Sequence, residues 1–457
     1  MPPKFGTSGL RGLVTELTDA LVGAHVAAFI RACDTGAGLY VGRDFRPSSP
    51  AITDTVTRAA RAMGLRVTDC GAVPTPALAL AAMEAGAAAI MVTGSHIPAD
   101  RNGLKFYTPE GEITKEDEAA ILAELSDAPE GEGPEPLAAP GAGRAYLARY
   151  TRAYGPAALE GLRIGLYAHS AVGRDLLSSC LTALGAEVTE LARAEHFIPV
   201  DTEAVPEDIR ASLRAWAAEG GFDAIVSTDG DGDRPLVTDA EGRVIPGDVL
   251  GQITARALGA EVVVTPVSSN TGAELCGAFG QVIRTRIGSP YVIAGMQGAA
   301  APVGYEANGG LLLGFDATGP AGPLPKLMTR DALLPIIAPL AAAKAAGQSL
   351  AARVAAEPAR FTATDRLQEM PTDRSQAFLQ GLRTDAAARG ALLTELQEEE
   401  SGMDTTDGLR LSLRSGRILH LRPSGNAPEF RVYAEAETAE AARDLMQRAF
   451  ALLRQRV

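Results

Sequence analysis

The sequence is poor in cysteine. Its four cysteines are spread over 457 residues, and no two of them form a CxxC pair. Such spacing argues against both a disulfide framework and a zinc site, and it is typical of a protein in a reducing compartment. We therefore expect a cytoplasmic protein. The cysteines are Cys33, Cys70, Cys180 and Cys276.

Long apolar runs are also missing. The opening stretch MPPKFGTSGLRG has no apolar segment behind its lysine, so we expect no secretory signal. The most apolar window, PALALAAMEAGAAAIMV, contains Glu84 and Gly86 and is too short to span a bilayer. It predicts a helix, a break at Gly86 and a buried strand.

Positive charge is in deficit. Lys and Arg number 42 against 56 Asp and Glu, for a formal net charge of −14. A field of that sign repels nucleic acid and anionic membranes, so we expect neither as a partner. An anionic ligand would need its positive contacts concentrated locally, so Arg and Lys near glycine mark candidate sites.

A strand, a polar loop, an amphipathic helix and a second strand recur in that order three times along the chain. The three stretches are residues 39–71, 163–191 and 261–285. Each has a β-branched or aliphatic run followed by residues suited to capping a helix. This order predicts successive α/β units with largely parallel strands.

The end of the chain has a different pattern. The short runs LRLSL, RILHLRP and EFRVYAEA predict strands joined by tight turns, including one at 414–416. Helical spacing follows, with Thr438 as the expected N-cap. We therefore predict three α/β domains with mixed, largely parallel sheets and a C-terminal antiparallel α+β domain. The predicted boundaries give domains 1–145, 146–250, 251–365 and 366–457.

The first candidate site follows a buried strand. In VTGSHIPADRNGLKFY, Ser95 comes directly after the apolar run AAAIMV. A serine hydroxyl is a weak nucleophile unless another group activates it, and the flanking residues are not those of a G-x-S-x-G elbow. Both a capping serine and a nucleophile fit this position.

The second candidate site is acidic. In FDAIVSTDGDGDRPLVTD, a predicted strand ends in Asp229, Asp231 and Asp233, separated by glycines. Converging carboxylates are costly unless a hard cation neutralises them, and Mg²⁺ prefers oxygen ligands. An EF-hand calcium loop is excluded, because its required glycine and glutamate are here Arg234 and Ala240.

The third candidate site is VGYEANGGLLLG, in which Glu306 and Asn308 lie beside glycines. Carboxylate and amide groups on such a loop suit sugar hydroxyls, but a tight hairpin turn explains the stretch equally well.

The fourth candidate site is LHLRPSGNAPEFRVY. Arginine binds phosphate in a bidentate manner, and a turn that exposes N–H groups binds anions. A phosphate site and a plain strand-to-strand turn both remain open. Its residues are Arg422, Ser424, Gly425, Asn426 and Arg431.

Together these loops resemble one family, the α-D-phosphohexomutases, which include phosphomannomutases and phosphoglucomutases. KFGTSGLRG is similar to the family's opening motif, TGSHIP to its phosphoserine loop and DGDGDR to its metal loop. YEANGG resembles the sugar loop, and RPSGNAP the phosphate loop. The resemblance covers the whole chain and implies four domains around a central cleft, each contributing one loop.

The resemblance implies an isomerase that moves a phosphoryl group between O1 and O6 of a hexose phosphate. The reaction would pass through a phosphoserine at Ser95 and a bisphosphate intermediate, with a hexose 1,6-bisphosphate as activator. Ser95 and the three aspartates would coordinate Mg²⁺. Lys105 is the candidate general acid/base, and Arg11 is expected near the same site. Arg234 is expected to orient the aspartates or to bridge to the phosphate, and His96 lies beside the nucleophile.

The sequence departs from the family at several positions. The sugar loop of the family has a serine and a terminal histidine where this chain has Asn308 and Gly310. A second family histidine, in a VGH-type turn, corresponds to Ser289. Asn426 and Ala427 replace the threonine and glutamate of the phosphate loop.

The expected activity is that of a phosphomannomutase, a phosphoglucomutase or both. The alternatives are a phosphoglucosamine mutase, a non-catalytic sugar-phosphate-binding relative, and a phosphatase that hydrolyses its own phosphoserine.

Overall fold

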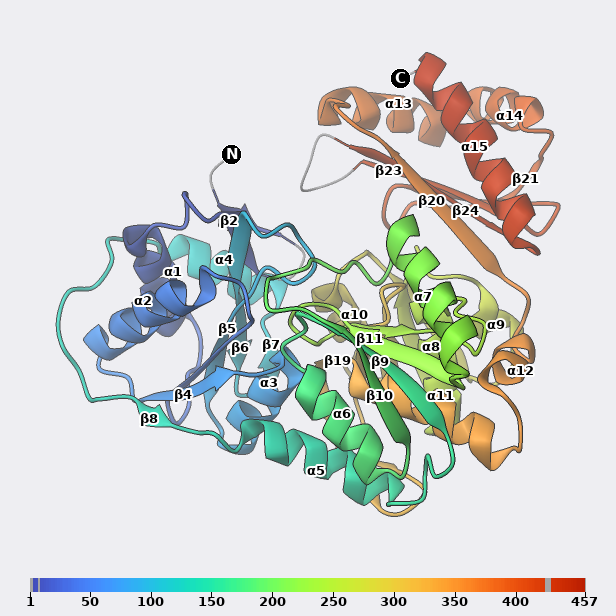
Figure 1. Cartoon of the computed structure of the whole chain (residues 1–457). Helices are drawn as coiled ribbons and strands as arrows, with labels where there is room; N and C mark the ends of the chain where they lie inside the picture. Colours follow the sequence, from blue (N-terminus) through green and yellow to red (C-terminus); the bar gives the residue numbers. More distant parts are fainter. Residues whose placement is uncertain (1–2, 7–8, 424–428, 457) are drawn as a thin grey trace. The chain divides into compact units, whose positions relative to one another are not determined.

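A computed structural model describes residues 3–6, 9–423 and 429–456 of the chain. The chain forms two compact units (Figure 1). Unit 1 contains Met1–Val263 and Gly288–Ala356, and unit 2 contains Val264–Ile287 and Glu357–Val457. Every helix within the described ranges is too short or too polar to cross a bilayer.

The first sheet of unit 1 mixes parallel and antiparallel pairs. β3 pairs in parallel with β4 and β5, whereas β6 runs antiparallel to both β5 and β2. All residues of β5 are buried, as in a strand covered on both faces. The strands are β1 Lys4–Phe5, β2 Leu10–Leu13, β3 Leu39–Arg43, β4 Val67–Ala72, β5 Ala88–Val92, β6 Arg101–Thr108, β7 Gly111–Glu112 and β8 Leu137–Ala138.

The helices around this sheet begin and end at residues that the sequence marks as helix boundaries. α1 begins after Thr18, whose hydroxyl accepts a hydrogen bond from the Leu21 backbone. The predicted helix, break and buried strand are confirmed, because α3 is followed by Gly86 with φ of +60° and then by β5. The helices are α1 Asp19–Ala32, α2 Ser49–Ala62, α3 Thr75–Glu84 and α4 Lys115–Ala123.

The second sheet has three parallel strands and one antiparallel edge. β9 lies between β10 and β11 and is parallel to both, while β12 is antiparallel to β11. The connection from β11 to β12 carries the three predicted aspartates. The elements are β9 Arg163–His169, α6 Arg174–Ala183, β10 Glu187–Arg193, α7 Glu207–Gly220, β11 Ala224–Thr228 and β12 Pro235–Val237.

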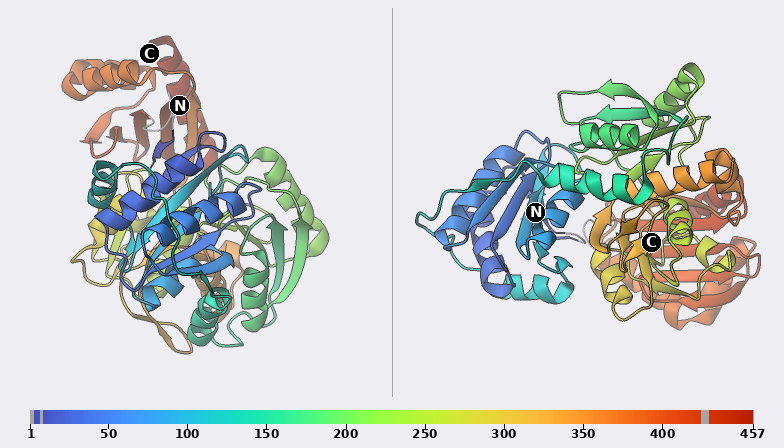
Figure 2. Two further views of the ribbon diagram at one scale, coloured as in Figure 1. Left: turned by 90° about the vertical axis from the view of Figure 1, so that its left-hand side faces the viewer. Right: turned by 90° about the horizontal axis from the view of Figure 1, so that it is seen from below.

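A helix links these two parts of unit 1. α5, Ala142–Tyr154, contacts both α3 and α6, and Figure 2 shows it running between the two parts. The hydroxyls of Tyr146 and Tyr150 both donate to the buried carboxylate of Asp331. Helix α5 is therefore also attached to the strand that carries Asp331.

The last part of unit 1 is an antiparallel meander with helices. β15 and β16 form a hairpin, and β19 pairs antiparallel with β16. The hairpin turn carries Glu306 and Asn308. The elements are α8 Gly247–Ala257, α10 Ser289–Met296, β15 Pro302–Tyr305, β16 Leu311–Leu313, β17 Ala317–Thr318, β18 Pro323–Leu324, β19 Leu327–Asp331, α11 Leu333–Ala345 and α12 Leu350–Ala355.

The third predicted strand–helix–strand repeat needs a correction. Its strands form, as β13 Val262–Pro266 and β14 Gln281–Thr285, but the amphipathic helix between them is wrong. Only α9, Gly272–Leu275, is helical there. Gly277 adopts φ of +63° directly afterwards, which stops the helix after about one turn. β13 crosses from unit 1 into unit 2.

Unit 2 contains the predicted antiparallel α+β fold. Its sheet has the order β20-β24-β23-β22-β21, and every pair is antiparallel. Figure 1 shows α13, α14 and α15 on one side of this sheet. The N-cap prediction is confirmed, because Thr438 Oγ1 accepts from the Ala441 backbone at 3.1 Å. The elements are β20 Phe361–Leu367, α13 Thr372–Thr384, α14 Ala386–Glu395, β21 Glu400–Asp404, β22 Leu409–Leu413, β23 Ile418–Pro423, β24 Phe430–Ala436 and α15 Ala439–Arg456.

Candidate active site

Ser95 lies in a strained turn at the end of β5. Its φ is +54°, a left-handed conformation that costs free energy for a residue other than glycine. The turn is held locally, because the Ser95 backbone nitrogen donates to Thr93 Oγ1 at 2.8 Å. The Ser95 hydroxyl is fully buried and donates to Asp229 Oδ2 at 2.6 Å. The predicted serine and acidic loops therefore meet.

Arg46 stabilises this turn through hydrogen bonds to its carbonyls. The sequence did not predict this role. Its guanidinium pairs with Asp44 at 3.2 Å, and both side chains are fully buried. It also packs over the ring of Phe197 at 4.1 Å. Gly94 is required beside it, because a Cβ there would lie 2.6 Å from the guanidinium carbon. Arg46 also donates to four loop carbonyls: Nη1 to Pro98 at 2.7 Å and Arg101 at 2.8 Å, and Nη2 to Ser95 at 2.9 Å and Ile97 at 2.5 Å.

The three aspartates converge as the sequence predicts. Asp229, Asp231 and Asp233 are fully buried, and one carboxylate oxygen from each lies within 4.8 Å of the others. The Oδ1 atoms of Asp231 and Asp233 have no hydrogen-bond partner among the described residues. Buried carboxylate oxygens in this state fit a hard cation such as Mg²⁺, which takes oxygen ligands.

Lys105 extends from β6 into this acidic cluster. Its ammonium lies 2.6 Å from Asp231 Oδ2 and 2.5 Å from Asp233 Oδ2. Burial by itself raises the pKa of Asp231, but Lys105 and the Thr75 hydroxyl lower it below its usual range. The pKa of Asp229 is raised well above its usual value by burial and by the two neighbouring carboxylates. The cluster thus needs positive charge, and Lys105 supplies part of it.

The remaining residues predicted for this site are His96, Arg234 and Arg11, and they lie near the aspartate cluster. His96 Nδ1 is 3.3 Å from Ser95 Oγ and 2.8 Å from Arg234 Nη1. Burial and the Arg234 charge lower the pKa of His96, so the imidazole is neutral. Burial lowers the pKa of Arg11 to about 10, with Arg234 and Arg330 adding to the effect.

Arg330, on β19, is a second buried arginine that the sequence analysis missed. Its side chain is 1% exposed. Nη2 lies 3.0 Å from Asp233 Oδ2, Nε lies 3.2 Å from Glu112 Oε1, and Nη1 lies 3.9 Å from Glu306 Oε2. The only sequence signal is an arginine within the apolar stretch LMTRDALLPII. Arg330 thus joins the metal loop to the predicted sugar loop.

The predicted sugar loop is a tight hairpin turn, as its alternative interpretation proposed. Gly309 has φ of +89°, and the Asn308 side-chain oxygen accepts from the Gly310 backbone at 3.0 Å. Glu306 is 5% exposed, and its Oε2 has no hydrogen-bond partner among the described residues. A buried carboxylate held in this way can accept a hydrogen bond from a ligand hydroxyl.

The fourth predicted site lies in unit 2. Arg422 and Arg431 are directly opposite each other on β23 and β24. Arg422 Nε donates to Asp407 Oδ1 at 2.8 Å, and Arg431 Nη2 donates to Glu429 Oε2 at 3.3 Å. The other predicted residues, Ser424, Gly425 and Asn426, lie outside the described residues.

Models of four protein domains match the chain in consecutive order. They are the phosphoglucomutase/phosphomannomutase alpha/beta/alpha domains I, II and III, over residues 2–131, 144–242 and 246–361, and the C-terminal domain over residues 373–452.

Relatives match along almost the whole chain. A phosphomannomutase from Sinorhizobium fredii is 46% identical, covering 99% of both proteins. One from Salmonella muenchen is 42% identical, covering 97% of this chain and 94% of that protein. A phosphoglucosamine mutase from Bacillus licheniformis is 28% identical, covering 95% of each.

The fold matches as well. A phosphoglucomutase/phosphomannomutase family protein from Burkholderia thailandensis has a TM-score of 0.76 at 22% identity, covering 97% of this chain and 96% of that one. The order of the four domains and the extent of the sequence matches lead to one conclusion. The chain belongs to the phosphoglucomutase/phosphomannomutase family.

Proposed function

We propose that this phosphohexomutase interconverts mannose 1-phosphate and mannose 6-phosphate, with Ser95 as the phosphoryl carrier. The observation that supports the proposal most directly is the 2.6 Å hydrogen bond from Ser95 Oγ to Asp229, at the edge of a buried three-aspartate cluster. A hydroxyl beside a cation site is where a transferable phosphoryl group can be neutralised.

Each half-reaction exchanges one phosphorus–oxygen bond for another. The bond from phosphorus to Ser95 Oγ breaks as a bond forms to the free hydroxyl of the sugar phosphate, which gives a hexose 1,6-bisphosphate. The proton of the attacking sugar hydroxyl passes to a base. The phosphoryl group at the other position then returns to Ser95, and the sugar oxygen it leaves takes that proton back. Lys105, whose nitrogen contacts Asp231 and Asp233 beside Ser95, is our candidate for this base: it would accept the proton as the amine and return it as the ammonium.

Positive charge is the second requirement of the reaction. Mg²⁺, when bound by Ser95, Asp229, Asp231 and Asp233, would offset the charge of the phosphoryl group and polarise it. Arg234 and Arg11 lie beside the same cluster and would orient the phosphoryl oxygens. Neutral His96 would hold Arg234 in place through its Nδ1 contact of 2.8 Å.

Substrate binding would divide between two loops. Glu306 and Asn308 would bind sugar hydroxyls, while Arg422, Ser424, Gly425, Asn426 and Arg431 would bind the phosphate that is not being transferred. Mannose and glucose differ only at C2, so we expect glucose phosphate as a weaker substrate. The 46% and 42% identities to phosphomannomutases favour mannose over glucosamine.

The test is a panel of mannose, glucose and glucosamine 1-phosphates, with trace hexose 1,6-bisphosphate as activator and phosphorus NMR as readout. We expect the 6-phosphate of mannose to form fastest, without free phosphate, and the reaction to stop in excess chelator. Free phosphate as the main product would identify a phosphatase instead, and no turnover of any sugar would indicate a non-catalytic relative. Fastest turnover of glucosamine 1-phosphate would overturn the mannose assignment.

A further inference from the structure

Two positions where the chain departs from its family are connected to one side chain, Arg330, the first directly and the second through the Glu112 carboxylate. The first is Gly310. A Cβ at this position would lie 3.1 Å from Arg330 Cδ and 3.2 Å from Arg330 Cγ. The backbone at Gly310 is not left-handed, so its conformation alone would accept another residue. Asn308 Oδ1 would lie 3.2 Å away, so a side chain at position 310 would crowd the stem of Arg330 and this amide oxygen by a few tenths of an ångström.

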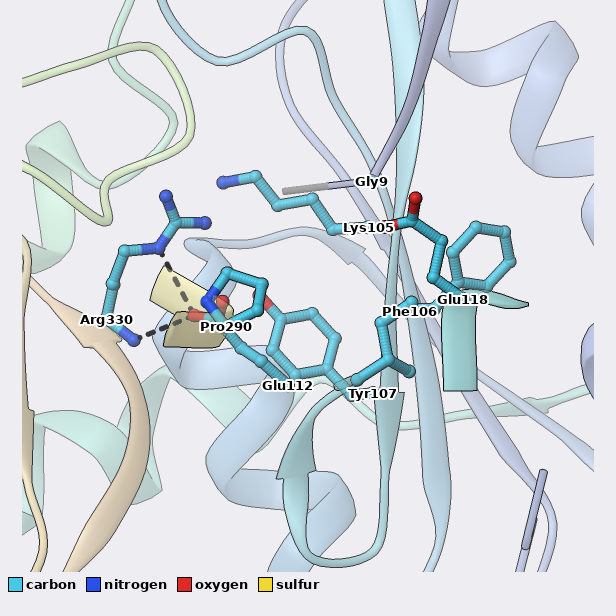
Figure 3. Close-up of a pocket in the computed structure, with 9 residues that line it drawn as sticks. Gly9, Lys105, Phe106, Tyr107, Glu112, Glu118, Pro290 and Arg330 are labelled. Carbon is cyan, nitrogen blue, oxygen red and sulfur yellow. Dashed lines mark hydrogen bonds and ion pairs between the residues drawn. The ribbon is translucent and has the colours of Figure 1, made fainter. Parts of the chain in front are cut away.

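The second position is Ser289, at the start of α10. Its hydroxyl donates to Glu112 Oε2 at 2.7 Å. The other oxygen of Glu112 accepts from Arg330 Nε at 3.2 Å and from the Arg330 backbone nitrogen at 3.1 Å, as Figure 3 shows. Ser289 therefore reaches Arg330 through a single shared carboxylate.

The guanidinium of Arg330 lies close to carboxylates of two loops, the predicted metal loop and the predicted sugar loop. It is 3.0 Å from Asp233 of the metal loop and 3.9 Å from Glu306 of the sugar loop. A small cavity of about 20 Å³ lies beside Arg330, Lys105, Tyr107 and Glu112. Figure 3 shows these side chains around that cavity.

We propose that Arg330 occupies the space of the missing side chain at position 310 and positions Glu306 relative to Asp233. It is a positioning residue, because it acts on a sugar-loop carboxylate and a metal-loop carboxylate. Gly310 makes room for its stem, and Glu112, which accepts from Ser289, also accepts from Arg330 Nε. The proposal rests on the assignment of these loops under the proposed function.

The experiment is a double-mutant cycle on Gly310 and Arg330. Gly310→His in the wild-type background should collide with Arg330, lowering both kcat/KM and the unfolding midpoint. Arg330→Ala should lower kcat/KM by about 10²-fold, as expected when reacting groups are misplaced by about 1 Å. The double variant should be at least about tenfold more active than Arg330→Ala, because histidine then has the space.

Two matched controls separate positioning from general stability. Arg330→Lys keeps the charge but loses the planar fork, so it should lower kcat more than it raises KM. Ser289→Ala should weaken the Glu112 contact only and lower kcat less than Arg330→Lys does. Circular dichroism and urea unfolding of every variant identify those that fail to fold.

The result that overturns the proposal is strict additivity, with Gly310→His equally harmful whether or not Arg330 is present. This outcome differs from failure of the proposed function, which would appear as a wild-type protein without mutase activity. If the wild type has no mutase activity, urea unfolding of the four proteins of the cycle still tests the proposal. Gly310→His should destabilise the wild type but not Arg330→Ala, and equal destabilisation in both would refute the steric claim.

Discussion

The arginines of the Ser95 region and those at the strand ends of unit 2 use the same chemical group in opposite ways. Arg46 is fully buried, and its contacts are internal: one carboxylate, four carbonyls and an aromatic ring. Arg422 and Arg431 each contact a carboxylate, but their side chains are 14% and 38% exposed. The buried Arg46 fixes a loop, whereas the partly exposed Arg422 and Arg431 remain accessible to a ligand.

The difference has a physical origin. Removing a guanidinium from water is costly, so a buried arginine persists only when its surroundings satisfy its donors. Arg46, whose donors are used by one carboxylate and four carbonyls, cannot also bind a phosphate without losing those partners. The comparison therefore separates an arginine that shapes the Ser95 loop from arginines that can bind a substrate. The predictions below change residues of one region or compare the two.

The largest effect should come from Ser95→Ala. Loss of a covalent nucleophile should reduce turnover by at least about 10³-fold. Intact-mass analysis after incubation with a hexose 1,6-bisphosphate should show one added phosphoryl group on the wild type and none on the variant. Ser401→Ala, at an exposed position of unit 2, is the matched control and should be labelled like the wild type. Equal labelling of Ser95→Ala would reject Ser95 as the carrier.

The next largest effect should be on the stability of unit 1. Arg46→Ala leaves the buried Asp44 carboxylate without its charge partner, which should lower the free energy of unfolding by about 3–5 kcal/mol. Arg46→Lys should recover only part of this loss, because one ammonium cannot satisfy four carbonyls. Urea unfolding followed by fluorescence measures both. A loss below about 1 kcal/mol would mean that the buried contacts of Arg46 do not hold the Ser95 loop.

A smaller effect should appear on acidification, in both units. His169 in unit 1 and His420 in unit 2 are buried, and burial lowers the pKa of each to about 4. Because the unfolded histidines have a pKa near 6.5, the unfolded state takes up protons first as pH falls. Each histidine therefore contributes stability above pH 6.5 that is lost between about pH 6.5 and 4, by at most about 3 kcal/mol.

Hydrogen exchange at pH 7 and pH 5 can measure this loss separately for the two units. His169→Gln should flatten the pH dependence of unit 1 only, and His420→Gln that of unit 2 only. A pH dependence that is unchanged in both variants would assign acid sensitivity to other groups.

Arg422→Ala should destabilise the protein less than Arg46→Ala does. The side chains of Arg422 and Asp407 are 14% and 16% exposed, so the pair retains some solvent and should contribute about 1.5–3 kcal/mol to folding, less than the fully buried pair of Arg46. Loss of a charged contact to phosphate should also raise KM by about tenfold or more. Steady-state kinetics measures the change in KM, and urea unfolding measures the change in the free energy of unfolding. An unchanged KM would remove Arg422 from the phosphate site.

Much of the fold and of the site could be predicted from local sequence. Several candidate site residues lie on strands or directly follow them, so residues close by in the chain indicate their positions. They are Ser95, Lys105, the three aspartates and Glu306. The amphipathic helix predicted within residues 261–285 was wrong, because Gly277 ends the helix after about one turn, a local effect that the strand–helix–strand pattern obscured. Arg46 gives no local sign that it will be buried, and the apolar stretch around Arg330 does not specify which carboxylates that arginine will contact.

The sequence by itself determined the order of the α/β units, the antiparallel C-terminal sheet and the motifs of the four loops, since each depends on residues close together in the chain. Tertiary structure alone decided which charges became internal. Arg46 reaches the Ser95 loop from another strand end, and Arg330 reaches Asp233 and Glu112 from β19. Burial changes the cost of a charge by several kcal/mol, and only the packed chain specifies which partners offset that cost.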